Sequence, residues 1–169
     1  LPSRHVTKGP ARAPNRSYYY AMSMTEDAIH QPLVGVATCW NEAAPCNISL
    51  NRQALSVKVG VSGAQGTPRE FTTITVTDGI AMGHEGMRSS LASREAIADT
   101  VELTMRGHCY DALVGLAGCD KSLPGMMMAM LRLNVPSVFL YGGSILPGKA
   151  PKGADVPAEF ADRDLTVQD

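Results

Sequence analysis

Several features that mark specialised protein classes are missing from this chain of 169 residues. No apolar run approaches the roughly 18 residues that a membrane-spanning helix needs, and the beginning of the chain lacks the apolar centre of a secretory signal. Basic residues form no stripe, like charges form no block, and the formal net charge is only −1, a pattern untypical of nucleic-acid binding. We therefore expect a cytoplasmic protein that binds neither membranes nor nucleic acid.

Cysteine is scarce, and no two cysteines form a C-x-x-C pair. The four cysteines are Cys39, Cys46, Cys109 and Cys119. A chain of this length with 44% hydrophobic residues can bury a core without disulfide bonds. In a reducing compartment, metal binding or catalysis is the more common use of such cysteines.

Strand-like apolar segments alternate with amphipathic helical segments through the middle of the chain. Strands are expected over 33–39, 72–77, 112–117 and 137–141, and helices over about 49–64, 93–108 and 124–133. This alternation with short connections predicts an α/β fold, with a mostly parallel sheet and helices on both faces in three layers.

Three regions follow from the composition. Residues 1–31, where basic residues alternate with prolines, are expected to form an irregular N-terminal arm with a turn or short helix near its end. Residues 32–148 are expected to form the α/β domain, which carries candidate metal ligands but is incomplete. Residues 149–169 are rich in proline, glycine, alanine and charge, and we expect a loop that leads into a missing remainder.

Reactive side chains come directly after the expected strands. Cys46 follows the first strand, Asp78 follows the second, and the third ends in the run Cys119-Asp120-Lys121. The carboxyl ends of parallel strands meet at one edge of a sheet, where ligands bind in such folds. Thiolates suit soft metals, whereas carboxylates suit Mg²⁺. The two cysteines and the two aspartates are therefore candidate metal ligands, with the amine of Lys121 beside them, although two thiolates alone complete neither a zinc site nor a four-cysteine iron–sulfur site.

Other residues with reactive groups have simpler interpretations. Cys39, at the end of a strand, and Cys109, at a helix terminus away from the expected edge, are both expected to be buried, inert thiols. His84 is either a substrate contact or a hydrogen-bonded loop histidine. The glycines at 79, 83 and 86 match no nucleotide-binding loop.

Five segments together resemble one enzyme family. They are 35–47, with its Pro-Cys-Asn end, and 76–87, 93–99, 118–125 and 141–148. Their order and spacing resemble the dihydroxy-acid dehydratases of the dihydroxy-acid/phosphogluconate dehydratase family, over residues 3–148. The resemblance implies the N-terminal portion of a larger, homodimeric two-domain hydro-lyase. This enzyme converts 2,3-dihydroxy acids to 2-keto acids in valine, isoleucine and leucine biosynthesis.

The resemblance also implies two cofactors. An iron–sulfur cluster, [2Fe–2S] in preference to [4Fe–4S], is held by three cysteines, of which two match Cys46 and Cys119, and one iron is left open as a Lewis acid. Mg²⁺ is held by residues matching Asp78, Asp120 and a carbamylated Lys121, the candidate catalytic residue. The third cysteine, a further carboxylate and a serine base have no counterpart here, so we expect the chain alone to be inactive.

Two alternatives remain open at this point. A sugar-acid or phosphogluconate dehydratase of the same family would share the metal ligands and differ in substrate. A non-catalytic module would use Cys46 and Cys119 to bind a metal without turnover.

Overall fold

A parallel sheet of four strands forms the centre of the structure, a computed structural model that describes residues 1–145, 148–149 and 164–165. The strands are β1 (Leu33–Thr38), β2 (Thr67–Thr72), β3 (Ala112–Ala117) and β4 (Ser137–Tyr141). Their order across the sheet is β2-β1-β3-β4, and every neighbouring pair is parallel. The expected α/β class and parallel sheet are therefore confirmed.

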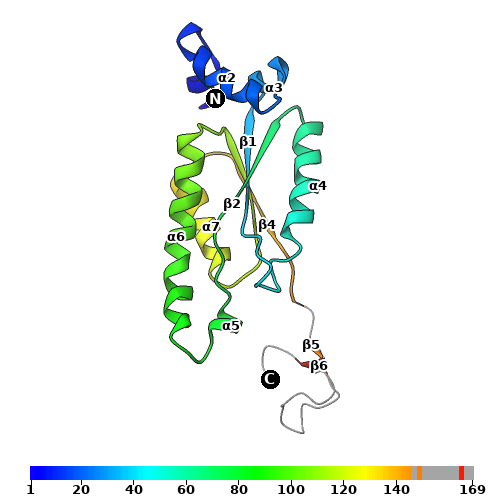
Figure 1. The fold of residues 1–169 in the computed structure, drawn as a ribbon, viewed down its shortest axis with the longest axis vertical. Helices are drawn as coiled ribbons and strands as arrows, with labels where there is room; N and C mark the ends of the chain where they lie inside the picture. The colour runs from blue at the N-terminus through cyan, green and yellow to red at the C-terminus, as the bar shows by residue number, and fades with distance from the viewer. Residues whose placement is uncertain (146–147, 150–163, 166–169) are drawn as a thin grey trace.

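Helices cover both faces of this sheet, as the sequence predicts. Helix α4 (Leu50–Gly63) lies on one face, and α6 (Gly86–Gly107) and α7 (Ser122–Leu133) lie on the other (Figure 1). The core is built from apolar residues of the helices on both faces and of the inner strands β1 and β3. They include Val36, Leu50, Ile97, Val101, Leu116 and Met126. The short helix α5 (Asp78–Ala81) lies beyond the carboxyl ends of the strands (Figure 1).

The second strand was placed wrongly from the sequence. The β-branched run 72–77 has high strand propensity, yet β2 ends at Thr72, where its partner β1 also ends. The last ladder pair joins Thr38 to Thr72, and the Thr73 N–H then donates to the Thr38 carbonyl at 2.9 Å. Strand propensity needs a neighbouring strand to act, so residues after Thr73 run on as a connection toward the carboxyl edge.

Helix α6 begins earlier than the expected start at Ser93. The Ser93 hydroxyl donates to the Ser90 carbonyl at 2.6 Å, three residues back along the same helix. A serine hydroxyl that bonds within its helix does not cap an N-terminus. The helix starts at Gly86 instead, so Ser90 and Ser93 both lie inside it.

The N-terminal arm is helical, which corrects the expectation of an irregular segment. It contains α1 (Arg4–Thr7), a 3₁₀ turn (Pro10–Arg12), α2 (Ala13–Ala21) and α3 (Glu26–His30). Pro10 and Pro14 stand in first turns, where a helix tolerates them. The arm packs over the amino ends of the strands, on the side of the sheet opposite α5 (Figure 1).

The last part of the chain is described only in short pieces. Gly148–Lys149 (β5) and Asp164–Leu165 (β6) form a two-residue antiparallel ladder where a loop was expected. The rest of the expected loop, residues 150–163 and 166–169, lies outside the described residues. Within the described ranges, no helix has the length and apolar character needed to cross a membrane.

Candidate metal centre

Two thiols meet at the carboxyl edge of the sheet. Cys46 lies in the loop between β1 and α4, and Cys119 follows β3. Both residues line one cavity, although 72 residues separate them in the sequence. Cys119 is 5% exposed and Cys46 is half-buried. The expected meeting of these two cysteines is what the fold produces.

The thiol pair shares its proton unequally. The hydrogen bond from Cys46 holds the pKa of Cys119 well below its usual value, against the opposing effect of burial, and Thr77 and backbone N–H groups assist. The same hydrogen bond, together with burial, raises the pKa of Cys46. Cys119 is therefore the thiolate of the pair, and a thiolate is the form that binds metals.

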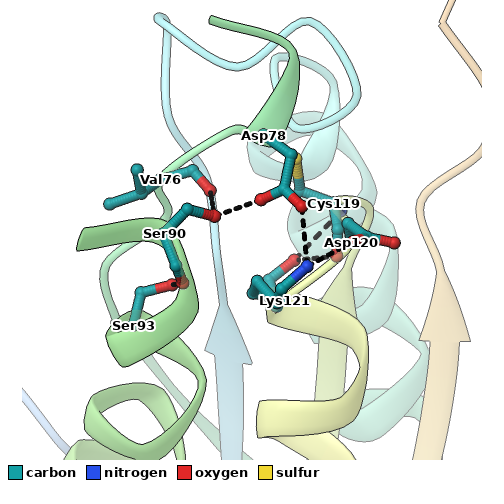
Figure 2. A network of polar contacts seen from close by, with 8 residues as sticks. Val76, Asp78, Ser90, Ser93, Cys119, Asp120 and Lys121 are labelled. Atoms are coloured by element: carbon teal, nitrogen blue, oxygen red, sulfur yellow. Dashed lines mark hydrogen bonds and ion pairs between the residues drawn. The ribbon is translucent and has the colours of Figure 1, made fainter. Parts of the chain in front are cut away.

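A lysine bridges two carboxylates close to Cys119 (Figure 2). The Lys121 Nζ lies 2.6 Å from Asp78 Oδ2 and 2.5 Å from Asp120 Oδ2. The Lys121 and Asp78 side chains are 16% and 22% exposed, whereas that of Asp120 is 70% exposed. Asp120 thus faces solvent, and the other two are held between α6 and the start of α7.

The charges of this trio are mutually stabilised. Burial opposes ionisation of Asp78, but hydrogen bonds from Lys121 and Ser90 outweigh it and lower the pKa of this carboxyl. Hydrogen bonds to Asp120 and Asp78 raise the pKa of Lys121. An unmodified Lys121 is therefore an ammonium, and it lies where a cation between the two carboxylates would lie.

A cavity of about 670 Å³ joins the two groups. Its lining includes Cys46, Asp78, Cys119 and Asp120, so four of the five predicted site residues share one space. Apolar side chains complete the lining, namely Pro45, Ile80, Met82 and Ile145. A cavity that combines apolar walls with a few converging polar groups is typical of a small-molecule site.

The remaining candidates lie apart from this cavity or are engaged elsewhere. Cys39 is fully buried, and burial raises its pKa to about 12. Cys109 lies near the opposite, amino ends of the strands, two residues after α6. The Gly86 N–H donates to His84 Nδ1 at 3.0 Å, so His84 Nε2 carries the proton and donates to the Ile80 carbonyl at 2.9 Å. Of the two interpretations of His84, a substrate contact or a hydrogen-bonded loop histidine, the structure favours the second.

Sequence reasoning missed the residues that hold the candidate ligands. The Ser90 hydroxyl donates to Asp78 Oδ1 from the buried face of α6 (Figure 2). Ser122 accepts the Cys119 N–H at 3.0 Å and donates to the Cys119 carbonyl at 2.9 Å. Asn47, next to Cys46, is the third supporting residue, and its Nδ2 donates to Thr75 Oγ1. Of the three, only Ser122 has a local signal, because its hydroxyl stands three residues after Cys119, the spacing of a side-chain turn.

The arrangement offers two half-sites side by side. Two thiols suit a soft metal centre and two carboxylates suit a hard cation. In the part of the chain that the structure describes, no three His, Cys, Asp or Glu side chains gather as a complete metal site. Further ligands would therefore come from a modified Lys121 or from polypeptide outside the described residues.

Comparison with known proteins identifies the family. The sequence profile described as "Dihydroxy-acid/6-phosphogluconate dehydratase N-terminal" matches residues 31–168. A dihydroxy-acid dehydratase of Dinoroseobacter shibae is 84% identical over 94% of this chain and 27% of its own length. Dihydroxy-acid dehydratase 2 of Bradyrhizobium diazoefficiens is 74% identical over 100% of this chain and 28% of its own length.

A more distant relative shows the same relationship. The dihydroxy-acid dehydratase of Metallosphaera sedula is 52% identical over 99% of this chain and 28% of its own length. The chain thus spans between a quarter and a third of the length of these relatives. From the profile match and these identities, the chain belongs to the dihydroxy-acid/6-phosphogluconate dehydratase family, in its N-terminal region.

Proposed function

We propose that this chain is the N-terminal part of a dihydroxy-acid dehydratase. The proposed enzyme is a cytoplasmic, homodimeric hydro-lyase that converts 2,3-dihydroxy acids to 2-keto acids in branched-chain amino acid biosynthesis. The names of the relatives support this activity. The observation that carries it is the convergence of a thiol pair and a carboxylate–lysine trio around one cavity of about 670 Å³.

The thiol pair fits two ligand positions of an iron–sulfur cluster. Cys46 and Cys119 line the same cavity, and Cys119 has the lowered pKa of a ligand thiolate. The thiol of Cys39, by contrast, is fully buried and has a pKa of about 12. With a third cysteine from polypeptide beyond this chain, the pair would hold a [2Fe–2S] cluster, or alternatively a [4Fe–4S] cluster, with one iron open.

The carboxylate pair fits Mg²⁺ once Lys121 changes its charge. As an ammonium, Lys121 occupies the position between Asp78 and Asp120 and repels a second cation. A carbamate on Nζ would turn this competing charge into an oxygen ligand, and Mg²⁺ prefers oxygen ligands. We therefore propose Asp78, Asp120 and carbamylated Lys121 as the Mg²⁺ ligands.

The two half-sites fit a single elimination. Metals bound there would supply Lewis acidity for loss of the C3 hydroxyl and for binding of the acidic substrate. The chain itself keeps the two half-sites adjacent: Cys119, Asp120 and Lys121 are consecutive, so the end of β3 carries part of each. Ile80 and Met82 give the cavity that the substrate would enter an apolar wall. The base that removes the C2 proton lies outside this chain, so the chain alone is expected to be inactive.

Anaerobic iron and sulfide analysis with a visible absorption spectrum tests this function. We would compare this chain with the full-length polypeptide that contains it. Cluster in the full-length protein, lost in Cys46→Ser and Cys119→Ser and kept in Cys109→Ser, is the expected result. A full-length protein without iron and sulfide would overturn the proposal and favour a non-catalytic metal-binding module.

A further inference from the structure

A fully buried asparagine stands beside the cysteine pair and has no assigned role. Asn47 directly follows Cys46 and is 0% exposed. Its Nδ2 donates to the Cys39 carbonyl at 2.5 Å and to Thr75 Oγ1 at 2.9 Å. Thr75 Oγ1 donates in turn to the same carbonyl at 3.0 Å. One closed triangle of hydrogen bonds therefore links three separate segments of the chain.

Each corner of this triangle belongs to a different part of the site. Cys39 directly follows β1, Thr75 lies on the connection after β2, and Asn47 lies on the turn that carries Cys46. The Asn47 backbone reinforces this turn, because its N–H donates to the Ala44 carbonyl at 2.8 Å and its carbonyl accepts from Leu50 at 3.1 Å. The position of the Cys46 turn relative to the sheet thus depends on the Asn47 amide.

The same asparagine also contacts the segment of the second thiol. A Cβ built on Gly118, the residue before Cys119, would lie 2.9 Å from Asn47 Oδ1 and 2.1 Å from the Cys46 carbonyl oxygen. The Cys46–Asn47 peptide and the end of β3 are therefore in direct contact. Movement of the Asn47 side chain would change the separation of the two thiols.

Only the nitrogen of the Asn47 side-chain amide takes part in this network. Asn47 Oδ1 is buried and has no hydrogen-bond partner among the described residues. An unpaired buried acceptor is unfavourable, so the donor bonds to Cys39 and Thr75 must outweigh it. An aspartate at this position would keep the shape of the side chain and place an oxygen against the Cys39 carbonyl.

We infer that Asn47 is a positioning residue that sets the separation of the Cys46 and Cys119 sulfurs for metal binding. This inference rests on the proposed function, in which the two thiols are ligands. Asn47 touches neither a substrate nor a metal in this role. It acts through the turn that carries Cys46.

Phenylarsine oxide measures the thiol separation without a cluster, because one arsenic atom bonds to two neighbouring thiols with release of one water. We expect Asn47→Asp to weaken its binding to the metal-free full-length polypeptide at least about tenfold, the equivalent of one lost buried hydrogen bond. Cys46→Ser gives the reference affinity of a protein in which arsenic cannot bridge Cys46 and Cys119. Asn41→Ala is the matched control, because Asn41 lies in the same loop and its Nδ2 also bonds to Thr75, at the carbonyl.

A second control separates positioning from stability. Val101→Ala removes core volume in α6, away from the thiols. It is expected to lower the free energy of unfolding without changing the affinity for phenylarsine oxide. The affinities of Val101→Ala and Asn47→Asp are compared under conditions in which both variants are folded. Thr75→Val tests the same triangle if Asn47→Asp does not fold, and it is expected to weaken binding in the same direction. Unchanged affinity in a folded Asn47→Asp or Thr75→Val chain would overturn the inference, as would equal weakening in Val101→Ala.

The cluster gives an independent readout. In the full-length polypeptide, Asn47→Asp is expected to change the visible circular dichroism of the bound cluster, because the signal depends on how the thiolates are held. A wild-type protein that binds no cluster would defeat the proposed function, while the arsenical comparison would still decide the role of Asn47. An unchanged cluster spectrum in the loaded variant would count against the positioning role.

Discussion

The backbone carbonyl oxygen of Cys46 lies directly against Gly118, so that a Cβ on Gly118 would come within 2.1 Å of it. Only a residue without a side chain allows β3 to end beside the Cys46 loop. Because the clash would be with backbone rather than with a flexible side chain, Gly118→Ala is expected to lower the free energy of unfolding by about 1–3 kcal/mol. Urea denaturation of this chain measures the change.

A second glycine gives the control for this prediction. Gly60 lies inside α4, and a Cβ there meets nothing within 4 Å. Gly60→Ala is expected to raise stability by about 0.5–1 kcal/mol, because alanine favours a helix. Equal effects of the two substitutions would show that the contact between Gly118 and the Cys46 loop contributes nothing to stability.

Much of the sheet could be predicted because its inner strands are continuous apolar runs. The strands β3 and β4 have the bounds expected from the sequence, and β1 ends one residue earlier. The error at β2 arose because residues 72–77 have strand propensity but no partner beyond Thr38. Pairing is a property of two segments, and one segment alone does not reveal where it stops.

Within the site, only the candidate metal ligands could be predicted, and not the residues that hold them in place. Cys46, Asp78 and Cys119 could be placed together, because strand ends in a parallel sheet meet at one edge. Ser90 and Asn47 could not, since each acts through a hydrogen bond to a residue fixed by tertiary structure. No sequence pattern predicts which distant residue a serine inside a helix or an asparagine in a loop will bond to.

Asp111 fastens the N-terminal arm to the sheet, and its removal should release the arm. Its carboxylate is 5% exposed and accepts the Ser3 N–H at 2.9 Å and the Leu33 N–H at 2.8 Å. Asp111→Ala leaves both donors unpaired, at a cost of about 1–3 kcal/mol for each. Trypsin should then cleave the arm, which carries several basic residues, faster than in wild type.

The control for this prediction is Glu42→Ala, which removes an exposed acidic side chain. Its cleavage rate is expected to match that of wild type. If the arm of Asp111→Ala resists trypsin as well as wild type does, packing of the arm helices and not the Asp111 carboxylate holds the arm in place.

Cys39 should be unreactive in the folded chain. It is fully buried, and burial raises its pKa to about 12, so at pH 8 it is a neutral thiol without access to solvent. Iodoacetamide should alkylate the partly exposed Cys109 at pH 8 and leave Cys39 unmodified until urea unfolds the chain. Mass spectrometry of the peptides measures both rates, and modification of the two cysteines at similar rates under native conditions would contradict the buried position of Cys39.

Ser90 should control the affinity of the proposed Mg²⁺ site. It is 0% exposed and its hydroxyl donates to Asp78, which fixes one carboxylate oxygen and leaves the other directed at Lys121 (Figure 2). Partners that orient metal ligands typically contribute about tenfold to a hundredfold to metal affinity, so Ser90→Ala is expected to weaken Mg²⁺ binding to the full-length polypeptide by that factor. Isothermal titration with Mg²⁺ measures it, with the exposed neighbour Ser89→Ala as the control. Equal Mg²⁺ affinity in Ser90→Ala and Ser89→Ala would mean that Asp78 is held well enough by Lys121 alone, or that it is not a ligand.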